Sequence, residues 1–144
     1  MNWYFDSSVL VAAAVRAHSH HARAAGILDE LVKKKHRGYV SAHGLVEVYS
    51  VLTRAPFTPP VYPSEAWQIL EQSFVPNLEV VTLSGKEYRD VIRDCAASGV
   101  AGGLVYDALH LRCAEKAGCE RVYTFNVKEF RRLAPQLEDR ICAP

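Results

Sequence analysis

Residues 2–15 read NWYFDSSVLVAAAV, an aromatic-rich run followed by Asp6, two serines and a stretch of small apolar residues. The aromatic run has the composition of a short β-strand. Ser7 and Ser8 offer hydroxyls that can cap a helix formed by the Ala- and Val-rich residues after them. The stretch therefore predicts a strand that leads directly into a helix, with Asp6 at the turn between them.

The same strand-to-helix order recurs along the rest of the chain. Short runs with the composition of β-strands lie at 38–42, 78–83 and 121–125. Each precedes a segment with apolar residues at helical spacing. Helices are predicted at 20–35, 43–53, 64–74 and 104–117, after the capping box of Ser84 and Glu87, and after Asn126. Strands that alternate with helices predict a parallel sheet covered on both faces, an α/β fold, and 144 residues suit a single domain over 1–144.

The charge balance excludes a strongly basic surface over the whole protein. Seventeen Lys and Arg against 16 Asp and Glu leave a net charge of +1, so RNA binding must be local, metal-assisted or shared between subunits. The apolar stretch at 9–15 is too short to span a bilayer, so we expect a cytoplasmic protein without membrane contact. The four cysteines lack the spacing of a structural zinc site, so we expect reduced thiols.

Three carboxylates stand out by their positions. Asp6 follows the first predicted strand, where open α/β sheets place their sites. Glu47 and Asp107 lie in helical patterns that are otherwise apolar nearby, and a carboxylate in such surroundings is costly unless a cation or a donor pairs with it. If the three converge, Mg²⁺ or Mn²⁺ would relieve their repulsion and activate a water for phosphodiester hydrolysis. Composition alone leaves open whether they meet.

Four ordered runs resemble the motifs of PIN-domain ribonucleases, in particular VapC-type toxins. They are WYFDSS with Asp6, SAHGLVEVYSVLTR with Glu47, VAGGLVYDALHLRCAEKAG with Asp107 and VYTFNVKEF with Asn126. The match keeps the family's order and spans almost the whole chain. It implies a PIN-like fold and metal-dependent endonucleolytic cleavage of single-stranded RNA. It also implies a homodimer that is neutralised by a VapB-like antitoxin peptide.

The resemblance also assigns roles to these residues. It makes Asp6 and Asp107 the principal metal ligands, with Glu47 completing the acidic cluster and Ser8 supporting it through hydrogen bonds. The fourth position, often an aspartate in the family, is Asn126, which ligates through a carbonyl oxygen and brings no charge. Glu129 supplies the missing charge if the turn aims it at the site, and is otherwise a surface residue of the last helix.

Each carboxylate also has a structural interpretation. Asp6 can merely cap the following helix. Glu47 can face solvent or pair with Arg54. Asp107 can be a first-turn charge that the helix dipole favours.

Other charged and titratable residues remain candidates for contacts with RNA or a partner. The histidines at 18, 20 and 21 and the basic run at 33–37 fit solvated helix ends better than ligands. Stronger candidates for substrate or antitoxin contacts follow the acidic motifs: Arg112, Lys116, Arg131 and Arg132. The homodimer is also predicted from two apolar side chains expected to be exposed, Trp67 and Phe74.

Two other functions stay open. One is a catalytically weak PIN-like protein that holds RNA or a partner, supported by the neutral Asn126 and the near-zero net charge. The other is a phosphotransfer enzyme or receiver domain with Asp6 as nucleophile. It is disfavoured because Ser8 stands where such a phosphatase has a second aspartate, and Asp6 has no acidic neighbour.

Overall fold

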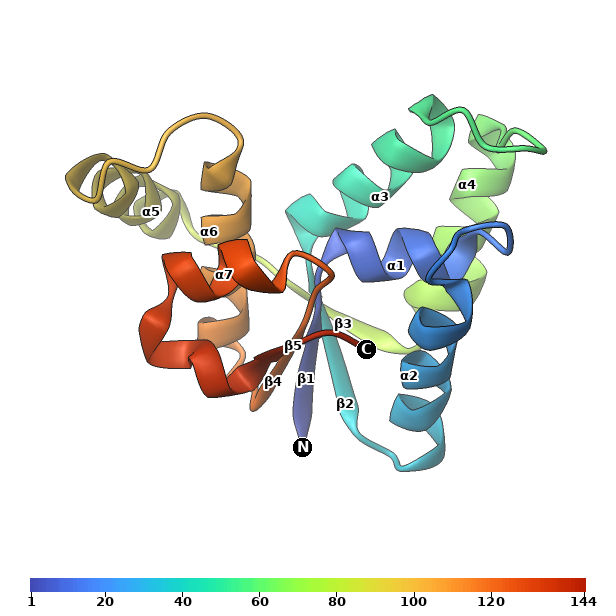
Figure 1. Ribbon diagram of the computed structural model, residues 1–144, viewed down its shortest axis with the longest axis horizontal. Helices are drawn as coiled ribbons and strands as arrows, with labels where there is room; N and C mark the ends of the chain where they lie inside the picture. The colour runs from blue at the N-terminus through green and yellow to red at the C-terminus, as the bar shows by residue number, and fades with distance from the viewer.

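The chain forms a five-stranded sheet with helices on both sides (Figure 1). The computed structural model describes residues 1–144. The strands are β1 (Asn2–Phe5), β2 (Arg37–Ser41), β3 (Leu78–Val81), β4 (Arg121–Tyr123) and β5 (Ile141–Cys142). The helices are α1 (Ser7–Ala14), α2 (His21–Lys33), α3 (Ala42–Arg54), α4 (Pro63–Ile69), α5 (Gly85–Ala97), α6 (Leu104–Lys116) and α7 (Val127–Leu133). A π-helical turn, Leu70–Phe74, extends α4, and a 3₁₀ helix, Pro135–Arg140, precedes β5. The predicted α/β fold is confirmed.

All neighbouring strands are parallel, in the order β3-β2-β1-β4-β5. The chain builds outward from β1 through β2 to β3, and then crosses back to place β4 and β5 on the other side of β1. The order in which strands are added therefore reverses beside β1. Open α/β sheets bind ligands at such a point, beyond the carboxyl ends of their strands. Asp6 and Thr124 directly follow β1 and β4.

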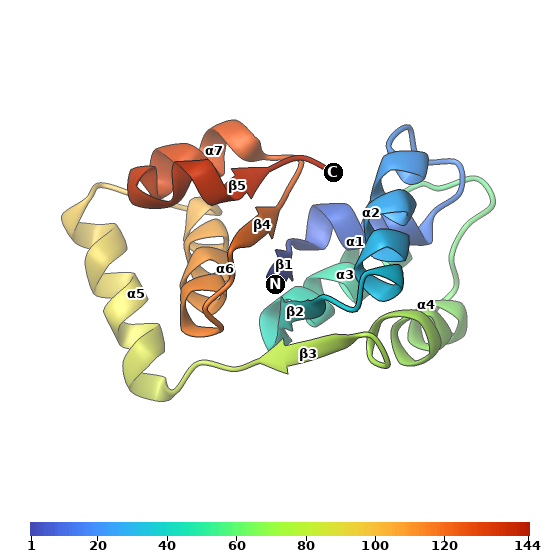
Figure 2. The same cartoon turned by 90° about the horizontal axis from the view of Figure 1, so that it is seen from below.

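Alternation along the central strand divides the apolar residues into two cores. Trp3 and Phe5 pack with residues of α1 to α4, whereas Tyr4 packs on the other face with residues of α5 to α7. Figures 1 and 2 show the two groups of helices on opposite sides of the sheet. Because β1 is buried on both faces, the side chains at its carboxyl end are held in a rigid position.

The segment after the prolines differs from the sequence prediction. The helix predicted at 64–74 begins one residue earlier, at Pro63, with Tyr62 at the N-cap position, since the fixed φ of proline suits the first helical turn. Trp67 is 59% exposed as expected, but the prediction that Phe74 is exposed was wrong, because Phe74 is buried in the core with α1 to α4. Leu70, one helical turn earlier, is buried in the same core, so Phe74 lies on the buried face of this segment.

The last ten residues contain structure that the sequence did not predict. The 3₁₀ helix leads into β5, whose Cys142 carbonyl accepts a hydrogen bond of 3.0 Å from the Thr124 backbone N–H. All four cysteines are free thiols, as expected. The longest helices have 13 residues, and none combines the length and apolar character that crossing a membrane requires.

Candidate active site

Asp6 is a buried carboxylate held by three hydroxyl groups. It follows β1 and is 2% exposed. Ser8 and Thr124 donate to Oδ2 at 2.8 and 2.7 Å, and Ser7 donates to Oδ1 at 3.2 Å. Asp6 occupies the N-cap position of α1 but its side chain makes no capping hydrogen bond, so the capping interpretation was wrong. These donors instead fix the carboxylate group at the sheet edge.

A network of hydroxyls joins the ends of β1 and β4. Thr124, which is fully buried, also accepts a hydrogen bond of 2.9 Å from the Asn126 backbone N–H. Ser8 accepts one of 3.2 Å from the Phe125 backbone N–H. Asn126 therefore lies one short turn away from Asp6, and its side chain makes no capping bond to α7. Ser8 was expected to support Asp6 through hydrogen bonds, and its geometry agrees.

Glu47 reaches the same region from α3. His110 Nε2 lies 2.5 Å from Glu47 Oε1, and His43 Nε2 lies 3.7 Å from the same oxygen. Burial alone would raise the pKa of Glu47, but the hydrogen bond and charge of His110 outweigh it and hold this pKa below its usual value. The interpretation of Glu47 as a solvent-facing residue or a partner of Arg54 was therefore wrong.

His110 is the centre of the cluster and was not predicted. It is 1% exposed, its Nδ1 lies 2.6 Å from the Tyr4 hydroxyl, and its Nε2 lies 3.4 Å from Asp6 Oδ1. Burial would lower the pKa of His110, but the Glu47 hydrogen bond and the nearby carboxylates raise it above its usual value. One signal could have revealed it: His110 is three residues after Asp107, on the same face of α6, in an apolar stretch.

Asp107 lies in the first turn of α6 and is half-buried. Its pKa is raised to about 6, first by burial and then by the negative charge of Asp6, with a smaller contribution from Glu47. The His110 charge acts in the opposite direction. Asp107, Asp6 and Glu47 are thus close enough to repel one another, although they come from three different elements.

The donor set fits a hard divalent cation in chemistry and charge. Carboxylate oxygens are the ligands that Mg²⁺ and Mn²⁺ prefer. After burial, the charges of Asp6, Glu47 and Glu129 also raise the pKa of Asp107, and a cation would relieve that repulsion. The structure does not contain three His, Cys, Asp or Glu side chains placed together as a ready-made metal site. Two of the carboxylates, Asp6 and Glu47, share His110 as a partner instead.

Several charged residues considered from sequence have partners outside this cluster. Glu129 pairs with Arg132 at 3.3 Å, although its charge still contributes to the raised pKa of Asp107. The other pairs are Lys33 with Asp29, Lys34 with Glu30, Arg112 with Asp94 and Lys116 with Glu87. Arg131 donates to the Ile141 carbonyl. The basic run at 33–37 thus includes two i,i+4 ion pairs of an exposed helix end, as expected.

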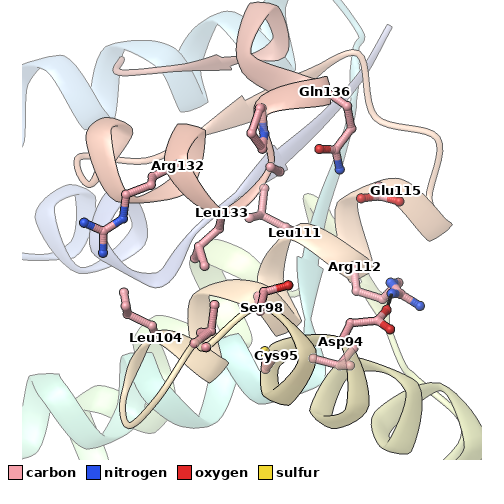
Figure 3. A pocket seen from close by; sticks show the side chains of 16 residues that line it. Asp94, Cys95, Ser98, Leu104, Leu111, Arg112, Glu115, Arg132, Leu133 and Gln136 are labelled. Carbon is pink, nitrogen blue, oxygen red and sulfur yellow. Dashed lines mark hydrogen bonds and ion pairs between the residues drawn. The ribbon is translucent and has the colours of Figure 1, made fainter.

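A cavity of about 610 Å³ lies between α5, α6 and the α7 region (Figure 3). It is lined by apolar residues such as Leu104, Leu111 and Leu133, and by the Arg112–Asp94 pair. Neither Asp6, Glu47 nor Asp107 lines it. The cavity is therefore separate from the carboxylate cluster.

Comparisons with known proteins identify relatives of this chain. The PIN-domain family model matches residues 3–135. Ribonuclease VapC40 of Mycobacterium tuberculosis is 33% identical over 115 residues, which is 80% of each chain. Ribonuclease VapC27 of the same organism is 34% identical over 105 residues, 72% of this chain and 70% of the relative.

Solved structures share the fold at lower identity. Mycobacterium tuberculosis VapC20, described as a sarcin-ricin loop cleaving toxin, superposes with a TM-score of 0.69 at 16% identity, covering 88% of this chain and 92% of that one. VapBC2 from Rickettsia felis, bound to a promoter DNA fragment, gives 0.66 at 21% identity and 92% coverage of both chains. VapBC-1 from nontypeable Haemophilus influenzae gives 0.66 at 15% identity, covering 99% and 98%.

The family model covers most of the chain, and the curated relatives are more than 30% identical over more than two thirds of it. This chain therefore belongs to the PIN-domain family, in its VapC-type ribonuclease branch.

Proposed function

We propose that the protein is a metal-dependent endoribonuclease and the toxin of a VapC-type toxin–antitoxin pair. The observation that carries this proposal is the clustering of Asp6, Glu47 and Asp107 beyond the end of β1, with His110 contacting both Asp6 and Glu47. Burial, and then the charge of Asp6, raise the pKa of Asp107 in this cluster to about 6. Acidic side chains clustered at the reversal point of a parallel sheet are suited to binding a cation and a phosphodiester. The names of the curated relatives support the choice of RNA as substrate.

In this proposal Asp6 and Asp107 hold a Mg²⁺ or Mn²⁺ ion, with Glu47 completing the cluster and Asn126 contributing through its carbonyl oxygen. The bound cation would polarise the phosphoryl oxygen and lower the pKa of a water. The hydroxyls of Ser8 and Thr124 fix the position of the Asp6 carboxylate. Glu47, kept ionised by His110, orients the attacking water.

Aromatic side chains beside the carboxylates favour a single-stranded substrate. Tyr106 stacks on His43 with ring centroids 4.9 Å apart and planes 9° apart, and Tyr106 is 46% exposed. His20 stacks on Phe125 at 4.5 Å, and the Arg23 guanidinium lies 5.6 Å from the same ring. Unpaired bases stack on such rings, whereas bases within a duplex present no free face.

We further propose that residues 1–144 form one PIN domain, because β5 beyond residue 135 completes the sheet. The protein would act in the cytoplasm as a homodimer and be bound by a VapB-like antitoxin. The VapBC assemblies among the solved structures support the antitoxin. The exposed Trp67 and Tyr62 offer apolar surface for a second copy.

A catalytically weak RNA- or partner-binding protein is the second candidate. The pairing of Glu47 with His110 favours it, because that carboxylate already has a partner. The neutral Asn126 also reduces the charge available for a second cation.

The deciding experiment is incubation of a mixed pool of structured and single-stranded RNA with Mg²⁺, Mn²⁺ or EDTA, using wild type and Asp107→Asn. Cleavage that needs the metal and is lost in Asp107→Asn supports the nuclease. A folded wild type that binds the RNA but cuts none of it under any condition supports the second candidate.

A further inference from the structure

His110 has a polar partner on each side of its ring, and the proposed chemistry uses only one of them. Its Nε2 faces Glu47 at 2.5 Å and its Nδ1 faces the Tyr4 hydroxyl at 2.6 Å. Tyr4 is fully buried in β1 and His110 is almost fully buried in α6. Glu47 is on α3, so this chain of contacts connects the central strand to two helices that bear carboxylates.

We propose that Tyr4 and His110 form a buried hydrogen-bond relay that positions Glu47, and that both are positioning residues of the nuclease. This inference rests on the proposed function, which assigns Glu47 to the site. An ionised carboxylate only accepts hydrogen bonds, so Nε2 must carry the hydrogen that points to Glu47. On the other side of the ring, Nδ1 lies within hydrogen-bonding distance of the Tyr4 hydroxyl, so the ring is held from both sides. Rotation of the ring would break both hydrogen bonds.

Tyr4 is well suited to anchor the relay. It lies two residues before Asp6 in the central strand, which is paired on both sides. The strand thus holds the hydroxyl, the hydroxyl holds the ring, and the ring holds Glu47.

Glu47 needs such a support more than Asp6 does. Asp6 already accepts hydrogen bonds from three hydroxyls, whereas the Glu47 side chain is 28% exposed and extends from a helix surface. Its second histidine, His43, lies at 3.7 Å from Oε1, beyond hydrogen-bonding distance. The same Nε2 of His110 is 3.4 Å from Asp6 Oδ1, so the ring also fixes the spacing of the two carboxylates.

The first test removes the anchor without changing the packing. Tyr4→Phe keeps the ring, and Tyr39→Phe is its matched control, since Tyr39 pairs with Tyr4 in the sheet and its hydroxyl makes no side-chain hydrogen bond. We expect Tyr4→Phe to lower kcat about 5-fold, the effect of one buried hydrogen bond, with KM nearly unchanged. Tyr39→Phe should cut like wild type.

The second test acts on the ring itself. His110→Leu should lower kcat by about 10- to 100-fold, as is typical of residues that orient groups in a metal site. His110→Gln keeps an N–H donor and an oxygen acceptor, and should recover part of that loss. If His110→Leu fails to fold, the kcat of Tyr4→Phe still tests the relay.

A readout in EDTA separates the relay from the nuclease activity. ¹⁵N NMR of the metal-free protein should show His110 protonated at Nε2, with both ring signals shifted in Tyr4→Phe and unshifted in Tyr39→Phe. Unchanged ring signals or unchanged kcat in Tyr4→Phe would overturn the relay, even in an active enzyme. A wild type that cuts no RNA would overturn the proposed function instead, while the ring signals still report on the relay.

Discussion

Asp107→Asn should make the metal-free protein more stable while abolishing RNA cleavage. The pKa of Asp107 is raised to about 6 from its usual 3.8, by burial first and by the charge of Asp6 second. At about 1.36 kcal/mol per pKa unit, the ionised carboxylate would cost about 3 kcal/mol of folding free energy. Because Asp107 is only half-buried and solvent screens its charge, we expect about 1–2 kcal/mol. That corresponds to a rise in Tm of about 3–8 °C.

The size of this effect depends on pH. A carboxyl group whose pKa is raised by folding destabilises the folded state when it is ionised, and ceases to do so when both states are protonated. The gap between variant and wild type should therefore be largest above pH 7 and shrink as pH falls through 6 towards 4. Mn²⁺ should also narrow the gap, because it would stabilise only the wild type.

Urea denaturation in EDTA at pH 7.5 and pH 4.5 measures this gap directly. Asp139→Asn is the matched control, since Asp139 is exposed and makes no ion pair, and its stability should follow the wild type. The proposed crowding of charge would be refuted if Asp107→Asn were less stable than wild type at pH 7.5. It would also be refuted if the stability difference between variant and wild type were the same at both pH values.

Three further predictions follow from other contacts. Thr124→Val removes the 2.7 Å donor to Asp6 and should lower the free energy of unfolding by about 1–3 kcal/mol in urea denaturation, with Thr124→Ser restoring most of it. Glu87, whose pKa is lowered to about 2 chiefly by its hydrogen bond from Lys116, should stabilise the protein above pH 4.5 and lose this effect as pH falls towards 2. The stability difference between wild type and Glu87→Gln in urea should therefore decrease over that range. Tyr106→Ala should raise KM for single-stranded RNA by about 5- to 100-fold with little change in kcat, and Tyr106→Phe should not, because stacking needs the ring rather than the hydroxyl.

The fold was largely predictable because its signals are local. Aromatic and β-branched runs mark β1 to β4, and apolar residues at helical spacing mark the helices after them. The two-residue β5 was missed because its pairing with β4 is decided by tertiary contact. Phe74 was misplaced because only the packing of the segment against the α1 to α4 core shows that it shares the buried face with Leu70.

The candidate site was predictable in its acidic residues and not in their partners. Asp6, Glu47 and Asp107 were identified by position and motif, and their assignment as metal ligands remains a prediction. The hydrogen-bond partners of these carboxylates could not be predicted from the sequence, because the contacts join residues far apart in the chain. Thr124 donates to Asp6 across 118 positions, and His110 meets Glu47 across 63.

Sequence alone was enough for the alternation of strands and helices, the parallel sheet and the acidic residues at its strand ends and helix starts, since these follow from local periodicity and residue chemistry. The tertiary structure decided which groups neutralise and orient those carboxylates. Tyr4 and His110 are separated by 106 positions, and only the packing of α6 against the sheet brings them within 2.6 Å. A buried polar group must find a partner, but the sheet order determines which residue is within reach.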